Sequence, residues 1–120
     1  MITSYKNTIE LLEDVTAKKL YANLILQLNK DFNYAAVDVS FPKTIEPAQL
    51  ITELHEIIYR LIQEKFAEYL NLLYIVDVPE KDVKNLEEAD TIEISRQVLF
   101  MILKREWQKV WFKSVYSTSN

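Results

Sequence analysis

From Gln49 to Pro79 the sequence reads QLITELHEIIYRLIQEKFAEYLNLLYIVDVP, and this stretch decides the fold. At about 100° per residue, its apolar side chains gather on one broad face of a helix. That face comprises Ile51, Leu54, Ile58, Leu61, Ile62, Tyr69, Leu72, Leu73 and Val76. The phase persists for roughly seven turns, and so long a helix needs packing partners along its whole apolar side. The pattern therefore predicts one long central helix in a helical protein.

The composition is that of an ordinary globular domain, with 120 residues of which 49% are hydrophobic and 27% charged. The chain has no cysteine, which excludes disulfides, thiolate zinc sites and cysteine nucleophiles. It also has no glycine, which excludes Walker-type phosphate loops and disfavours folds built from many β-hairpins. Its apolar runs are far shorter than the roughly 20 residues that span a membrane, and the N-terminal segment does not resemble a signal peptide. We therefore expect a soluble cytoplasmic protein.

Apolar residues recur at helical spacing on both sides of the central stretch. In residues 4–33 the pattern thins around Asp14–Lys19, so this segment forms either one long helix or two shorter ones. Further along, Asp90 and Glu93 have the spacing of a capping box, with aspartate in the capping position. This spacing predicts that a third long helix begins there and runs to about Lys113.

Two short segments, near residues 34–41 and 75–78, each place Val-Asp-Val within three residues of a following proline. We predict both as short extended segments. They either pair as a two-stranded ribbon or simply end the helices that precede them, and an isolated ribbon of this kind is only marginally stable.

These patterns predict an all-α fold, an antiparallel bundle of three long helices, with four helices as the alternative. Residues 1–116 form a single helical domain in this prediction, and residues 117–120 form a disordered tail.

Charge is distributed unevenly along the chain. Residues 94–120 contain five basic residues and one acidic residue, whereas residues 80–93 are rich in aspartate and glutamate. The segment KREWQKVWFKSVY, residues 104–116, interleaves basic and aromatic side chains, a pattern that nucleic-acid and membrane-surface proteins also use. Because Trp107 and Trp111 fall on the apolar side and the acidic segment offers an internal partner, contact with protein is the simpler interpretation.

Two polar residues of the central stretch suggest chemistry. His55 begins the string HEIIY, which lacks the second histidine of the zinc-protease motif, and Thr52 occupies the position where a di-iron motif needs glutamate. Lys65 falls within the apolar face, where its stem can cover apolar surface while the ammonium reaches water. A structural role is the simpler interpretation for both residues.

We therefore expect a non-enzymatic module for protein–protein interaction or self-association, acting as a homodimer or with another protein. No cofactor, metal, membrane or small-molecule substrate is implied. The alternatives are a nucleic-acid-associated protein that uses Arg105, Lys109 and Lys113, and a small metal-binding or enzymatic bundle centred on His55. The residues expected to bind the partner are Lys65, Tyr69, Tyr74, Phe100, Lys104, Arg105, Lys109, Phe112, Lys113 and Tyr116.

Overall fold

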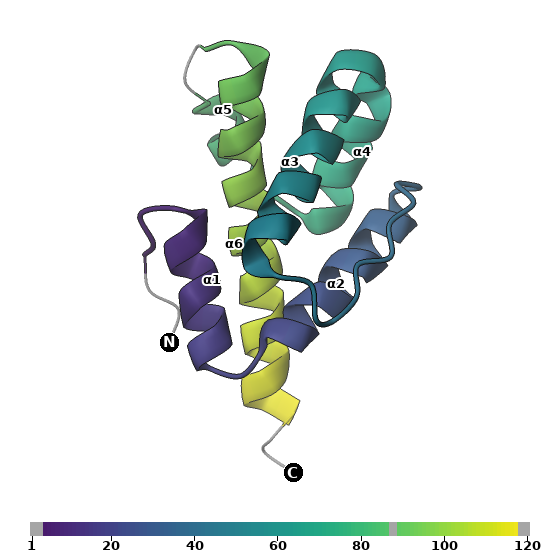
Figure 1. The fold of residues 1–120 in the computed structure, drawn as a ribbon. Coiled ribbons are helices and arrows are strands. Elements are labelled where there is room, and N and C mark those ends of the chain that lie inside the picture. The colour runs from purple at the N-terminus through teal and green to yellow at the C-terminus, as the bar shows by residue number, and fades with distance from the viewer. Residues whose placement is uncertain (1–3, 87–88, 118–120) are drawn as a thin grey trace.

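The computed structural model describes residues 4–86 and 89–117, and all regular structure in these ranges is helical. The described helices are α1 (Thr8–Ala17), α2 (Tyr21–Tyr34), α3 (Pro47–Glu64), α4 (Phe66–Val76), α5 (Glu80–Lys84) and α6 (Thr91–Ser117), as Figure 1 shows. The all-α prediction is confirmed. The prediction of three long helices, or four, is wrong, because these residues form six helices. Within the described ranges, no helix combines the length and the apolar character needed to cross a membrane.

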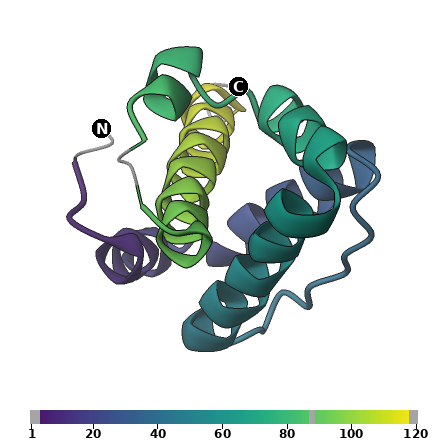
Figure 2. The same cartoon turned by 90° about the horizontal axis from the view of Figure 1, so that it is seen from above.

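The last helix, α6, organises the fold. It runs through the molecule and packs against α1, α2, α3 and α4 (Figures 1 and 2). Its core side chains, among them Val98, Ile102, Leu103 and Trp107, have essentially no exposed surface. The central position predicted for the stretch 49–79 therefore belongs to α6.

The predicted central helix is broken at Lys65. The residue has φ −140° and ψ 61°, ends α3 and precedes α4, which turns back beside α3 in Figure 1. In a continuous helix Lys65 would project from the middle of the apolar face. The break places Lys65 in solvent and lets the apolar sides of α3 and α4 face the core separately.

Residues 4–33 form two helices, which resolves the alternative left open by the sequence. α1 ends in a Schellman motif, in which the Leu20 N–H donates to the Val15 carbonyl and the Lys19 N–H donates to the Thr16 carbonyl. α2 and α4 end with the same pair of bonds, donated by Val37 and Ala36 and by Val78 and Asp77. Glycine normally supplies the left-handed residue of this motif, but here Lys19, Ala36 and Asp77 adopt φ of 60°, 64° and 69°.

The two predicted extended segments do not form a ribbon, and the described residues contain no strand. Residues 75 and 76 belong to α4, so the prediction for 75–78 is wrong there. Residues 35–46 leave α2 without regular structure, because asparagine side chains of α2 satisfy their backbone. Asn29 bonds both the N–H and the carbonyl of Phe41, and Asn33 donates to the Val39 carbonyl. Each Val-Asp-Val segment thus follows or overlaps the end of a helix.

The predicted start of the third helix is confirmed, since the side chain of Asp90 accepts a hydrogen bond of 2.9 Å from the Glu93 N–H. The helix extends past the predicted end at Lys113 to Ser117. Ser117 is therefore helical rather than part of a disordered tail, and residues 118–120 of that predicted tail lie outside the described residues.

Candidate functional site

The basic residues of α6 that the sequence singles out contact other groups of the protein. Arg105 donates to the carbonyl and the carboxylate of Asp77, at 3.0 and 3.1 Å. Lys113 donates to the Gln27 side-chain oxygen at 2.7 Å, and the Lys104 ammonium lies 5.4 Å from the centre of the Phe100 ring. Of these three cations, Arg105 is paired with an opposite charge, which leaves less positive charge for a phosphate backbone.

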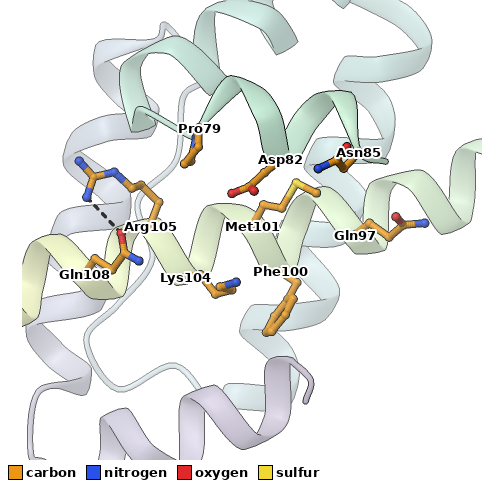
Figure 3. Close-up of a pocket in the computed structure, with 9 residues that line it drawn as sticks. All are labelled: Pro79, Asp82, Asn85, Gln97, Phe100, Met101, Lys104, Arg105 and Gln108. Carbon is orange, nitrogen blue, oxygen red and sulfur yellow. Dashed lines mark hydrogen bonds between the residues drawn. The ribbon is translucent and has the colours of Figure 1, made fainter. Parts of the chain in front are cut away.

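A groove with a volume of about 310 Å³ lies between α5 and α6 and brings three of the predicted residues together, Phe100, Lys104 and Arg105. Figure 3 shows Asp82 of α5 and Asn85, which follows α5, pointing toward Met101 of α6, while Phe100 and Lys104 project from the side of α6 that faces away from α5. Asp82 is the acidic residue of segment 80–93 that lines this groove, whereas the ion pair of Arg105 is made with Asp77, which precedes that segment.

A buried ionic cluster lies on the other side of α6, between α2 and α6. The Lys109 ammonium is 2.7 Å from the Asp31 carboxylate, 3.4 Å from the Glu106 carboxyl and 3.4 Å from the Ile75 carbonyl of α4. Gln27 donates a second hydrogen bond to Asp31, at 3.1 Å. The cluster joins three helices through polar groups in a part of the fold that is otherwise apolar.

Glu106 is the most unusual member of this cluster. Its side chain is 0% exposed, and neither of its carboxyl oxygens accepts a hydrogen bond from any residue that the structure describes. Burial, together with the neighbouring Asp31 carboxylate, raises the pKa of Glu106 to about 9. Burial also disfavours the charged form of Asp31, but the neighbouring Glu106 and the hydrogen bonds from Lys109 and Gln27 outweigh burial and hold the pKa of Asp31 below its ordinary value. The pKa values of the two neighbouring carboxyl groups are therefore shifted in opposite directions.

Sequence reasoning predicted Lys109 as a partner-binding residue and missed Glu106 and Asp31. Lys109 instead has a mostly buried side chain, 19% exposed, that bonds within the protein. A signal for Glu106 was present, because it is the one acidic residue after Glu93 and shares the helical face of Leu99, Ile102, Leu103 and Val110. Nothing in the sequence pairs it with Asp31, which comes from a helix near the other end of the chain.

The remaining predicted residues are spread over the molecule. Tyr69 lies in the core, where burial raises its pKa, and its ring lies 5.3 Å from that of Phe66. Lys65 is exposed at the break between α3 and α4. Phe112 and Tyr116 are exposed near the end of α6 and stack on one another at 6.0 Å. These residues therefore do not form one continuous surface.

Tyr74 belongs to a distinct surface, the outward face of α4. The exposed residues of this helix are Phe66, Ala67, Leu70, Asn71 and Tyr74. None of the five carries a charge, whereas the exposed residues of α3 and α6 include Glu56, Arg60, Lys104 and Lys113. Three of the five are large and apolar or aromatic, and they recur every fourth residue, so they form one stripe.

His55 packs against α6 as a structural residue would. Its Nε2 lies 2.7 Å from the hydroxyl of Ser95, which is buried and donates to the Ile92 carbonyl. Since that hydroxyl has a single proton, His55 donates from Nε2 to Ser95 in this arrangement. Among the residues described, no group of three or more histidine, cysteine, aspartate or glutamate side chains could hold a metal ion.

No protein-family model, no curated protein and no solved structure matches this chain. The surfaces and chemistry of the fold itself therefore carry the inference about function.

Proposed function

We propose that this protein is a small self-associating module, in which the outward face of α4 pairs with the same face of a second copy. The observation that carries the proposal is the absence of charge on that face, combined with its stripe of Phe66, Leu70 and Tyr74. α4 lies at the edge of the molecule beside α3, so the stripe is open to a partner (Figure 1).

A second copy suits this face for an electrostatic reason. In a twofold interface the same patch meets itself, so a charged residue near the axis faces its own charge. The α4 face avoids this repulsion. In an antiparallel pairing about Leu70 and Asn71, Phe66 lies opposite the Tyr74 of the other copy. The two Asn71 amides then come together near the axis, where each can donate to and accept from the other.

The size of the stripe indicates a reversible dimer. Phe66, Leu70 and Tyr74 are 55%, 50% and 80% exposed. Together they offer on the order of 400 Å² per copy, given about 150–250 Å² for a whole aromatic side chain. A standard interface buries about 800 Å² per partner, so the stripe supplies roughly half of one. We therefore expect weak and reversible association.

The test is sedimentation velocity over protein concentrations from low micromolar to millimolar, on the wild type and on L70E. Leu26 provides a matched control, because it is a leucine on α2 with 49% exposure against 50% for Leu70. The wild type and L26E should dimerise alike, and L70E should remain monomeric because a buried, unpaired carboxylate opposes the interface. A wild type that stays monomeric up to millimolar concentration would overturn the proposal.

The same experiment separates the α4 face from the aromatic stack of Phe112 and Tyr116. Phe112 and Phe66 are 53% and 55% exposed, so F112E and F66E form a second matched pair. Loss of the dimer in F112E but not in F66E would place the interface at the end of α6 instead of on α4.

A further inference from the structure

The buried cluster between α2 and α6 supports an inference that is independent of self-association. We propose that Asp31 and Glu106 are a proton-sharing carboxyl pair, held in place by Lys109, which takes up a proton as the chain folds. The pair then stabilises the packing of α2 against α6, and this stabilisation is lost at alkaline pH.

The geometry supplies the first argument. A carboxylate buried without a hydrogen-bond donor is among the least stable groups a core can hold. Neither oxygen of Glu106 accepts a hydrogen bond from a described residue, and Lys109 lies closer to Asp31 than to Glu106, at 2.7 against 3.4 Å. As a neutral acid, Glu106 instead becomes a donor, and its O–H can bond the Asp31 carboxylate beside it.

Charge balance supplies the second argument. The charged groups that act on Glu106 are Asp31 from α2 and Lys109 from α6, and α4 reaches the cluster through the Ile75 carbonyl. With Glu106 neutral, one carboxylate faces one ammonium and the cluster has no net charge. With Glu106 ionised, two buried carboxylates compete for the same ammonium, which is costly at low dielectric. The folded structure therefore favours the protonated form of Glu106.

The linkage has a definite sign. The pKa of Glu106 is raised from an ordinary 4.5 to about 9, so between these values the folded chain keeps a proton that the unfolded chain releases. The stability from this group is therefore fully present below pH 4.5 and is lost as the pH rises toward 9. Few other groups titrate between pH 7.5 and 9, since the chain has one histidine and no cysteine, and the α-amino group that also titrates there is common to the wild type and every variant.

Proton release on unfolding tests the proposal. The chain is denatured with urea at pH 8 in weakly buffered solution with an indicator dye. The wild type should release about one proton more than E106Q, because glutamine keeps the shape of the side chain and has no proton to lose. E93Q makes the same change at an exposed position of α6 and should release as much as the wild type. Equal release by E106Q and the wild type would overturn the proposal.

Two further measurements test the pair itself. In the wild type, a ¹³C NMR titration of the side-chain carboxyl groups should reveal one glutamate that is still protonated at pH 7. This measurement needs no substitution, so it remains decisive if E106Q fails to fold. In D31N the ionisation of Glu106 should move to lower pH, because the neighbouring negative charge is gone. A wild type with every glutamate ionised at pH 7, or an unchanged midpoint in D31N, would exclude a shared proton.

Discussion

Trp107 is a fully buried tryptophan whose only polar group needs a partner, and it finds one in the N-terminal segment. Its indole N–H donates to the Tyr5 hydroxyl at 2.9 Å, and that hydroxyl donates to the Asp14 carboxylate at 2.5 Å. Lys18 is bonded to the same carboxylate, and these two hydrogen bonds lower the pKa of Asp14. This chain of polar contacts joins the start of the described structure to the middle of α6.

At this scale we predict that Y5F lowers the free energy of unfolding by about 1–3 kcal/mol, because it leaves the buried indole N–H without an acceptor. Urea denaturation followed by tryptophan fluorescence measures the change. Y34F removes a hydroxyl from a tyrosine that is 71% exposed and should have little effect. Equal stabilities for the two variants would mean that water replaces the Tyr5 hydroxyl at no cost.

Among the elements, α1, α2 and α4 end with left-handed residues that are not glycine. A residue with a Cβ atom pays about 1 kcal/mol for this conformation. The three motifs share a second property, since the residue after the left-handed one is apolar in each, namely Leu20, Val37 and Val78. That residue packs onto or within the core, which offsets part of the backbone cost. At these three helix ends, packing of the following apolar residue thus compensates for the absence of glycine at the left-handed position.

This arrangement predicts opposite effects for one substitution at two positions. A36G should stabilise the fold by about 0.5–1 kcal/mol, because glycine adopts the left-handed conformation without strain. A22G, at an exposed position within α2, should destabilise it by a similar amount. Thermal and urea denaturation measure both. If A36G is also destabilising, its gain in unfolded-chain entropy exceeds the strain that it relieves.

Over the whole molecule, a polar seam runs between α2 and α6, from Lys113 and Gln27 to Lys109, Asp31 and Glu106. Buried ionic contacts of this kind add little net stability. Removing one partner is nevertheless costly, because the charged group that remains is buried without its partner.

K109M should therefore lower the free energy of unfolding by about 2–4 kcal/mol, since Asp31 keeps its charge but loses its ammonium. The double variant D31L/K109M should recover most of the loss. R60M serves as the control, because the Arg60–Glu56 pair is exposed and should contribute less than about 1 kcal/mol. If chemical denaturation shows that K109M loses no more stability than R60M, the buried Lys109–Asp31 pair contributes no more than an exposed ion pair.

Sequence periodicity predicted the all-α class because it reports which side of each helix is buried, but it did not predict how many helices form. It could not predict the break at Lys65, because the apolar residues before and after Lys65 follow one continuous helical phase. The pattern of side chains therefore does not report that the backbone turns there. It recognised the basic residues of α6 but not their partners, because Gln27 and Asp31 come from α2 and Asp77 follows α4. Glu106 was not predicted as a buried residue because a single acid among basic residues is typical of a solvent-exposed helix face, although its helical register places it in the core.

The central position of α6 has a consequence for how a cell makes this protein. The ribosome synthesises α1 to α5 first, yet α1, α2, α3 and α4 all pack against a helix that begins at Thr91. Until that helix leaves the exit tunnel, the apolar sides of the earlier helices have no common partner. The nascent chain therefore keeps these surfaces exposed until α6 has been made, the state in which chaperones bind and proteases cut.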